Sequence, residues 1–574
     1  MQKHWFIKQT PDPENIQATV NDLKVSPVMA SLLTQRNLTT LPQIRSFFTP
    51  ELSGLHDPFL MLNMSEAVER LQAAVQTGQR IMVFGDYDVD GTTSVALVYS
   101  VLKDFVSVDH YIPDRYEEGY GLSYQGIDTA LENGCGLLIA LDCGIKEVEK
   151  VRYAKEKGLD IIVCDHHTPG PEIPDCIVLD PKQAGCEYPF KELCGCGVGF
   201  KLLQAWFAKT NKDPDKLFDY LDLVAIAIGA DIVSVSGENR ILCKHGIQRM
   251  NASPRAGISA LVEQAQRSFP LDLSNVVFTI APRINAAGRL KSGSRAVELL
   301  LAESKDEAKK IALEIDEYNS ERRILDAQIT QEALELIAGD ELFLSRKSTV
   351  VFQSGWHKGV VGIVASRLIE HHYRPTIVLT ENKGEATGSA RSVSGFNVYD
   401  AITSCEHLLT QYGGHQHAAG LTLPLENVGL FTEHFDAYVQ QNIQPLDEVE
   451  DLVIDLEIKA SDLFLAGESV LQIPRIYRML EQMEPFGPGN DKPVFCIRNA
   501  YANKQKVLKE AHLKFELVDP VSGIELSAIG FNMADKADLI ASGCAFDCAF
   551  TLETNTWQNR TTLQIQVRDI RETI

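Results

Sequence analysis

Acidic and histidine side chains follow several short apolar segments in the first half of the chain. Residues 81–85, 136–141 and 161–164 are apolar runs, and each is followed at once by an acidic residue. In a parallel sheet the carboxyl ends of the strands meet at one edge, so we expect the side chains after these runs to lie close together. They are Asp86, Asp88, Asp90, Asp142, Asp165, His166 and His167.

A cluster of this composition predicts a site for divalent metal ions. Asp86, Asp88 and Asp90 alternate with other residues, so in an extended segment their carboxylates would point the same way. Crowded carboxylates repel one another, and divalent cations would neutralise them. The mixture of carboxylate and imidazole groups favours Mn²⁺ or Mg²⁺, with Mn²⁺ the better match. Two such ions would activate a water molecule and hold both oxygens of an in-line phosphoryl displacement, which indicates phosphoester hydrolysis.

Three other site types fit the sequence less well. An EF-hand calcium loop also begins DxDxDG, but its twelfth position here is Leu97 rather than Glu, and the motif follows a predicted strand. A nucleotide-binding P-loop needs a Gly-Lys pair and a thermolysin-like zinc site needs HExxH, and the sequence contains neither. A single Asp at a strand end is also often a turn or helix-capping residue, so the prediction depends on all the motifs occurring together.

The residues around these positions predict an α/β domain with a parallel sheet. Apolar runs, including a fourth at 176–179, alternate with amphipathic stretches at 92–105 and 146–157. That alternation is typical of strand, helix, strand units, whose helices cover the sheet. We assign this catalytic domain to residues 76–300 and treat residues 1–75 as a cap on it.

The rest of the chain predicts a long helix and two further domains. Residues 303–337 have helical spacing with no Gly or Pro, which predicts a long helix within a connecting segment at 301–340. A second, smaller α/β pattern follows in residues 341–446. Short strands with turn signals between residues 447 and 574 predict a small β-barrel of the OB type.

Composition and charge indicate an ordinary globular chain in a reducing compartment. Of 574 residues, 45% are hydrophobic and 23% charged. No apolar run reaches the roughly 18 residues of a membrane span, no signal-peptide pattern follows Met1, and several of the 12 cysteines lie in apolar runs. We therefore expect a cytoplasmic protein without a membrane partner. The net charge of −24 argues against a protein that coats nucleic acid, but a local basic groove on a nuclease is compatible with it.

The order of the motifs resembles that of the DHH phosphoesterase superfamily. The segments are Asp86-Tyr-Asp-Val-Asp-Gly91, Leu141-Asp-Cys-Gly144, Asp165-His-His167 and Ala225-Ile-Ala-Ile-Gly-Ala-Asp231. The resemblance implies that the metal ligands are Asp88, Asp90, Asp142, His166 and Asp231, with Asp86 either a ligand or a residue that orients one. It also implies that Asp90, Asp142 and His167 are catalytic, with Asp142 a candidate bridge between two cations and His167 facing the substrate phosphate.

Two glycine-rich segments later in the chain resemble the companion DHHA1 domain. They are Gly388-Ser-Ala-Arg-Ser392 and Gly413-Gly-His-Gln-His-Ala-Ala-Gly420. In the first segment, glycine permits a close backbone approach and Arg391 offers a planar fork to a phosphate. We therefore include Ser389, Arg391 and His415 among the substrate-binding candidates, together with Arg115 in the catalytic domain.

Two basic regions predict contacts with a phosphate backbone. Between residues 283 and 295 the charged side chains are Arg283, Arg289, Lys291 and Arg295, and we add Arg283 and Arg289 to the substrate-binding candidates. A solvated loop is the alternative. In the predicted barrel, lysines and aromatic residues interleave as in OB folds that hold single strands, unless the rings belong to the barrel core. These residues are Tyr501, Lys504, Lys506, Lys509, Lys514, Phe515 and Phe531.

Further segments resemble the single-strand-specific exonucleases of this superfamily. They include Pro282-Arg-Ile-Asn-Ala-Ala-Gly-Arg-Leu290 and Glu484-Pro-Phe-Gly-Pro-Gly-Asn490. The resemblance implies hydrolysis of single-stranded DNA from the 5′ end in DNA repair and recombination. It implies two Mn²⁺ or Mg²⁺ ions as cofactors, and a helicase and a single-strand-binding protein as candidate partners.

Two alternative functions stay open. A small-substrate phosphoesterase would act on short oligonucleotides or cyclic dinucleotides, and the predicted barrel argues against it. A non-catalytic scaffold would bind single-stranded DNA without cleaving it, and the complete set of acidic and histidine motif positions argues against that.

Overall fold

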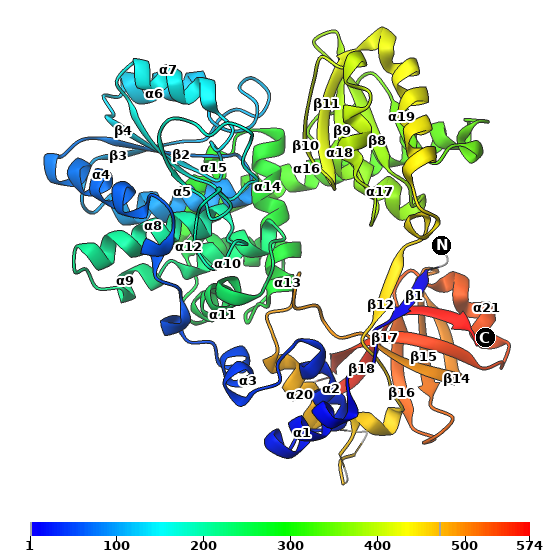
Figure 1. Ribbon diagram of the computed structural model, residues 1–574. Coiled ribbons are helices and arrows are strands. Elements are labelled where there is room, and N and C mark those ends of the chain that lie inside the picture. The colour runs from blue at the N-terminus through cyan, green and yellow to red at the C-terminus, as the bar shows by residue number, and fades with distance from the viewer. Residues whose placement is uncertain (1–2, 466, 470–471, 559, 574) are drawn as a thin grey trace.

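Three lobes make up the structure, a computed structural model that describes residues 3–465, 467–469, 472–558 and 560–573 (Figure 1). In Figure 1 the first lobe runs from blue to green, the second is mainly yellow-green, and the third is mainly orange to red, with the dark-blue start of the chain against it. Helix α16 (Lys305–Ala338) leads from the first lobe to the second, as its uninterrupted helical pattern predicts. Two α/β lobes and a β-barrel confirm the expected fold class.

A five-stranded parallel sheet forms the centre of the first lobe. Its order is β3-β2-β4-β5-β6. The strands are β2 (Ile81–Gly85), β3 (Val108–Tyr111), β4 (Leu137–Leu141), β5 (Asp160–Cys164) and β6 (Ile177–Leu179). Strands β2 and β4 are buried at every position, which is typical of parallel strands covered on both faces. The sequence did not predict β3, because this short edge strand is only partly buried and carries polar residues.

Helices cover both faces of this sheet. Along β2, Ile81 and Val83 belong to one apolar cluster and Met82 and Phe84 to another, as expected when successive side chains point to opposite faces. The first cluster includes residues of α4 (Met64–Thr77), α5 (Val89–Leu102), α8 (Gly195–Lys209) and α10 (Leu221–Ala230). The second includes residues of α6 (Tyr124–Glu132) and α7 (Val148–Glu156).

The strand register brings the predicted site residues to one edge. Gly85 pairs with Leu141, and Leu141 pairs with Cys164, so these three strands end level with one another. Asp86, Asp142 and Asp165 follow these strand ends directly. The convergence predicted from the three apolar runs is therefore a consequence of an aligned parallel register.

The second lobe is a smaller mixed sheet of order β10-β11-β9-β8-β7. Its strands are β7 (Thr349–Phe352), β8 (Thr376–Asn382), β9 (Glu385–Arg391), β10 (Gln411–His415) and β11 (Ala418–Pro424). Only β7 and β8 are parallel, and the other pairs are antiparallel. Helix α17 (Val361–His371) packs on this sheet, and α19 (Val428–Asn442) contributes Phe431 and Phe435 to the apolar core.

The third lobe is a closed barrel of five main strands, which confirms the predicted barrel. They are β14 (Phe495–Leu508), β15 (His512–Val518), β16 (Glu525–Gly530), β17 (Phe546–Trp557) and β18 (Arg560–Glu572). Pairing of β14 with β17 closes the barrel. Phe515 is buried in its core, whereas Tyr501 and Phe531 are exposed. The core interpretation is therefore right for Phe515 only.

The expected cap at residues 1–75 divides between two lobes. Helix α4 packs on the first lobe, but α2 (Pro27–Gln35) places Met29, Leu32 and Leu33 in the core of the barrel lobe. The strand β1 (His4–Ile7) pairs in parallel with β12 (Asp451–Ile454), which leads into the barrel (Figure 1). The prediction of a cap on the catalytic domain was wrong for this first part, because its apolar partners, such as Leu456 and Phe495, lie far away in the sequence.

A buried guanidinium attaches the barrel lobe to the first lobe. Arg240, in α11 (Gly237–Ala252), donates to the carbonyls of Phe47, Glu484 and Pro485 at 2.9–3.4 Å. Burial lowers the pKa of Arg240 to about 10. Among the described residues, no helix has both the length and the apolar content that crossing a membrane would require.

Candidate active site

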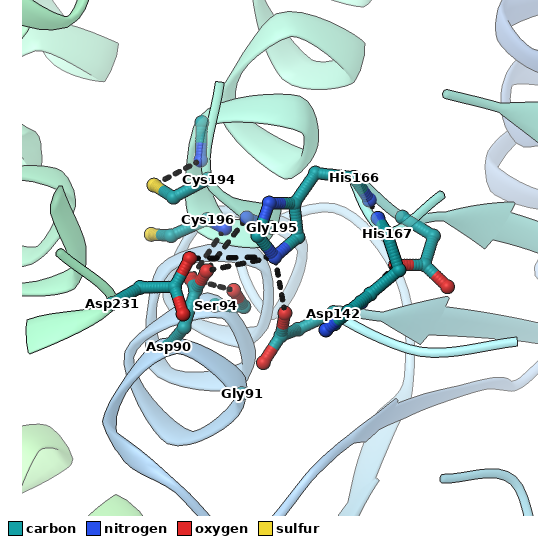
Figure 2. Close-up of polar contacts among 12 residues, drawn as sticks. Asp90, Gly91, Ser94, Asp142, His166, His167, Cys194, Gly195, Cys196 and Asp231 are labelled. Carbon is teal, nitrogen blue, oxygen red and sulfur yellow. Dashed lines mark hydrogen bonds and ion pairs between the residues drawn. The ribbon is translucent and has the colours of Figure 1, made fainter. Parts of the chain in front are cut away.

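Four of the predicted metal ligands lie together at the carboxyl edge of the parallel sheet. The His166 imidazole lies between the carboxylates, with its Nε2 atom 3.2 Å from Asp142 Oδ1, 3.5 Å from Asp231 Oδ2 and 3.8 Å from Asp90 Oδ2 (Figure 2). Asp142 and His166 come from loops after β4 and β5. Asp90 lies in the first turn of α5, and Asp231 follows the last turn of α10.

The N-terminus of helix α8 holds Asp90 in place. The backbone N–H groups of Gly195 and Cys196 each donate to an oxygen of Asp90 at 2.7 Å (Figure 2). Free N–H groups at a helix N-terminus favour an anion. Position 195 requires glycine, because a Cβ atom there would lie 2.6 Å from the Cβ atom of Asp142. The sequence contained no signal that would pair Gly195 with Asp90.

Several buried polar atoms of this cluster form no hydrogen bond in the part of the chain that the structure describes, although Asp142 Oδ1 and His166 Nε2 face each other at 3.2 Å. They are Asp86 Oδ2, Asp142 Oδ1 and both ring nitrogens of His166. Buried polar groups of proteins are nearly always paired, so these atoms point to a bound group. Asp142 also has φ of 60°, a left-handed conformation of a kind that gathers at functional sites.

The protonation equilibria of the cluster fit a cation site. Burial, followed by the charges of Asp90 and Asp88, raises the pKa of Asp142 well above its usual range. Burial and neighbouring carboxylates also raise the pKa of Asp90 to about 7 and that of Asp231 to about 8. Burial lowers the pKa of His166 to about 3, so its ring is neutral near pH 7, as metal ligation requires. A cation would offset the carboxylate repulsion.

Two overlapping groups of side chains could each hold an ion. Asp90, His166 and Asp231 form one group, and Asp142, His166 and His167 form the other, with the ligand atoms of each group within 4.8 Å of one another. The groups share His166, whose Nε2 atom can bind only one ion, so they form one continuous cluster, in which a second ion would bind mainly through carboxylates such as Asp142.

The segment that carries Asp86, Asp88 and Asp90 is not extended along its whole length. The alternation argument assumed an extended segment, but Asp88 caps helix α5, and its Oδ1 atom accepts from Gly91 N at 3.0 Å. Asp86 is fully buried, and its Oδ1 atom accepts from Gly121 N at 3.3 Å. Neither belongs to the two groups above. Both lie close enough to raise the pKa values of neighbouring groups, so their roles as ligands stay predictions.

His167 has its own orienting partner. Its Nδ1 atom lies 2.7 Å from Asp165 Oδ1, and Asp165 also accepts backbone N–H bonds from Ile145, His166 and His167. Burial opposes protonation of His167, but the hydrogen bond and charge of Asp165 raise its pKa to about 9. The Nε2 atom lies 3.2 Å from the hydroxyl of Tyr120. Asp165 was expected to lie in this cluster but had no predicted role, and no feature of the sequence indicated Tyr120.

A group of arginines lies where the first two lobes meet. Arg391 donates to Ser389 Oγ at 2.7 Å, and Arg289 donates to the carbonyl of Gly359 in the second lobe at 3.1 Å. Arg115 lies over the ring of Tyr87 at 4.7 Å. Burial, followed by the charges of Arg115 and Arg391, lowers the pKa of Arg289 to about 9. Within the described ranges none of the three arginines has an ion pair, so together they favour an anion.

The second lobe also places His415 in this region, at the end of β10. Burial and the charges of His417 and Arg391 lower the pKa of His415. In the basic segment at residues 283–295, two of the cations have acidic partners. Arg283 pairs with Asp316 at 2.8 Å, and Arg295 pairs with Glu298 and Glu314. The segment itself contains no acidic residue, and these partners come from α15 (Ser294–Leu301), which carries Glu298, and from α16, which carries Glu314 and Asp316.

Three domain families match successive parts of the chain. The DHH family, N-terminal domain, matches residues 80–228, the DHHA1 domain matches residues 346–441, and the RecJ OB domain matches residues 454–569. Each match falls on one of the three lobes. The first includes all the cluster residues described above except Asp231.

Characterised relatives align along nearly the whole chain. The single-stranded-DNA-specific exonuclease RecJ of Bacillus subtilis (strain 168) is 36% identical over 98% of this chain and 70% of that protein. RecJ of Escherichia coli (strain K12) is 34% identical over 88% of this chain and 90% of that protein. The crystal structure of RecJ with Mn²⁺ from Thermus thermophilus covers 99% of this chain and 80% of that one, with a TM-score of 0.84 and 28% identity. The chain therefore belongs to the RecJ family of DHH phosphoesterases.

Proposed function

We propose that this chain is a metal-dependent exonuclease that hydrolyses single-stranded DNA from the 5′ end and releases nucleotides. The observation that carries the proposal is the buried group of carboxylates and His166 with unpaired ligand atoms, in a chain of the RecJ family. We assign Asp90, Asp142, His166 and Asp231 to two Mn²⁺ or Mg²⁺ ions, with Asp86 and Asp88 as further ligands or orienting residues. When bound, such ions supply an activated water and neutralise charge on the phosphate.

The protein's own residues then position the phosphate and move protons. Asp165 fixes the ring of His167 and keeps it protonated near pH 7, so its Nε2–H can donate to a phosphate oxygen or to the leaving oxygen. The N–H groups of Gly195 and Cys196 prevent Asp90 from rotating away. Asp142 is held by its strained loop at the end of β4, where it faces His166.

We assign the arginine group to recognition of the strand and its end. A 5′-terminal phosphate has a higher charge than an internal diester, so donors at a fixed distance from the metals can select an end. Ser389 and Arg391 from the second lobe and Arg115 from the first are the proposed terminal-phosphate residues. Arg289, Arg283 and His415 are proposed contacts for neighbouring phosphates.

We propose that the barrel holds the strand away from the metals. Lys506 and Lys514 are register partners on β14 and β15, and like charges opposite each other favour a bound anion. Tyr501 and Phe531 are 43% and 51% exposed and are available for stacking on bases.

The domain division that we propose for the chain is a first segment at 1–75, a catalytic domain at 76–300, a connection at 301–340, a DHHA1 domain at 341–446 and the barrel at 447–574.

Two observations weigh against the alternative functions. A hydrolase of short oligonucleotides or cyclic dinucleotides would not need a barrel with exposed lysines and aromatic rings. A non-catalytic scaffold would not need unpaired ligand atoms in a buried cluster. We further propose a cytoplasmic location, where DNA is accessible, and cooperation with a helicase and a single-strand-binding protein, which would prepare single strands for repair and recombination.

The function is tested by incubating the purified protein with 5′-phosphorylated single-stranded DNA carrying an internal label. With Mn²⁺ the strand should shorten from its 5′ end and release nucleotides, whereas a blunt-ended duplex should persist. Excess EDTA should stop the reaction. Full activity in EDTA, or shortening from the 3′ end, would contradict the proposal.

Metal binding should be visible without any reaction. We expect Mn²⁺ to raise the melting temperature of the metal-free protein, because a ligand at one hundred times its Kd stabilises the folded state by about 2.7 kcal/mol. Differential scanning fluorimetry with and without EDTA measures the shift. Asp90→Asn should lose most of this shift, and an equal shift in that variant would place the ions elsewhere.

The barrel should affect long strands more than short ones. Tyr501→Ala and Phe531→Ala should each weaken binding to a long oligonucleotide by roughly fivefold to a hundredfold, since stacking contributes roughly 1–3 kcal/mol per base. Hydrolysis of very short strands, which do not reach the barrel, should change little. Equal losses on both substrates would place these rings in the catalytic part of the enzyme. Binding can be measured by fluorescence anisotropy with Ca²⁺ in place of Mn²⁺.

A further inference from the structure

Two large apolar side chains are exposed in two segments that pack against each other, one of which ends at the proposed ligand Asp231. Ile232 directly follows Asp231 and is 68% exposed, and Phe278, in the π-helix η3 (Val276–Ile280), is 77% exposed. Helix α10, just before Ile232, is buried from Leu221 to Gly229. In the π-helix, Val276 and Ile280 are buried. Each exposed side chain thus lies next to buried residues of its own segment.

The two segments pack against each other near the end of α10. A Cβ atom on Gly229, near the end of α10, would lie 3.2 Å from Cγ2 of Val277. Ile232 follows Gly229 by three residues, and Phe278 follows Val277 directly. Figure 1 places α13 (Leu273–Asn275) and α14 (Ala281–Leu290), which flank the π-helix, on the side of the first lobe that faces the other lobes. We call Ile232 and Phe278 the apolar lip.

The backbone at the apolar lip is unusual at both residues. Ile232 has φ of 57°, a left-handed conformation that Gly or Asn adopts readily and a β-branched residue rarely does. Strain of this kind persists where the surroundings impose it, and it gathers at functional sites. A π-helix is also rare and is frequent at functional sites. A turn with no further role would be more stable with Gly or Asn at position 232. We therefore infer that the isoleucine side chain has a role of its own.

We propose that the apolar lip holds the base of a nucleotide next to the bond being hydrolysed, an inference that rests on the proposed exonuclease activity. The bases of a single strand offer flat apolar faces, to which an exposed aromatic ring and an exposed aliphatic side chain are complementary. Asp231, the neighbour of Ile232, lies 3.5 Å from His166, so a base held here places its phosphate at the metal ligands. Ile232 and Phe278 are therefore positioning residues.

This role depends on the presence of a base and not on its identity, because every base has a stacking face. The substrates are therefore a 5′-phosphorylated oligonucleotide and versions with one abasic unit moved in turn along the nucleotides nearest the 5′ end. When the abasic unit occupies the nucleotide that the apolar lip holds, the kcat/KM of the wild type should fall by roughly tenfold. Phe278→Ala should lose a similar factor on the intact strand and nothing further on that abasic strand, whereas Phe278→Trp should retain activity.

Two further variants separate this role from a structural one. Ile232→Gly should lower kcat/KM on the intact strand in the same base-dependent way, yet raise the melting temperature because the backbone strain is relieved. Ile324→Ala, on α16 and also 68% exposed, is the matched control and should change neither quantity.

If Phe278→Ala and Ile232→Gly slow intact and abasic strands by the same factor, or leave both unchanged, the lip does not hold a base and the proposal is overturned. A lower melting temperature for Ile232→Gly would overturn the argument from strain. If the wild type fails to digest the intact strand with Mn²⁺, the exonuclease activity itself is wrong, and this result is seen before any variant is compared.

Discussion

Asp142→Asn is expected to lower turnover on single-stranded DNA by several orders of magnitude without unfolding the protein. The substitution removes one negative charge from the position that faces His166, and Asp142 belongs to one of the two candidate cation groups. Asn is preferred to Ala here, because Asp142 has a left-handed φ of 60° that Asn tolerates. Burial and neighbouring carboxylates raise the pKa of Asp142, so its ionised form is unfavourable in the fold. Without metal, the variant should therefore be at least as stable as the wild type.

The measurements are turnover with saturating Mn²⁺ and the melting temperature in EDTA. Asp222→Asn is a suitable control, because Asp222 is equally buried but pairs with Arg255 at 2.8 Å outside the cluster. The Asp222→Asn variant should have the same turnover per folded molecule as the wild type. If Asp142→Asn retained activity, the cluster would not be the catalytic centre, and if it unfolded, Asp142 would have a structural role.

The convergence of the site residues could be predicted because it follows from local rules. Apolar runs such as those of β2 and β4 predict buried parallel strands, and the ends of parallel strands meet at one edge. The long helix α16 and the order of the barrel strands were likewise predictable from periodicity and turn signals. None of these required knowledge of distant contacts.

What the sequence did not reveal depends on contacts between distant residues or on a change of backbone direction. The alternation of Asp86, Asp88 and Asp90 suggested a common direction, but the helix begins at Val89 and Asp88 becomes its cap. Arg283 stood in a segment without acidic residues, yet Asp316 reaches it from the long helix. Similarly, Trp5 donates to Asp569 at 2.7 Å, a contact that no local pattern could indicate.

Arg391→Ala is expected to reduce the preference for 5′-phosphorylated over 5′-hydroxyl strands. Arg391 has no ion pair within the described part of the chain, and its Nη1 atom donates to Ser389 Oγ and to the carbonyl of Ala390, near Arg115 and Arg289. A hydrogen bond to a charged group contributes about 1.5–3 kcal/mol, so the preference should fall by roughly tenfold to a hundredfold. The ratio of kcat/KM for the two kinds of end is the quantity to measure.

The ratio distinguishes end recognition from general binding. Asp142→Asn should abolish cleavage of both ends, whereas Arg391→Ala should act mainly on the phosphorylated one. Arg374 belongs to the same lobe, likewise lacks an ion pair among the described residues, and stacks on Phe343 at 4.5 Å, so Arg374→Ala should leave the ratio unchanged. If Arg391→Ala slowed both substrates by the same factor, the arginine would serve strand binding or folding, and the terminal-phosphate pocket would have to be abandoned.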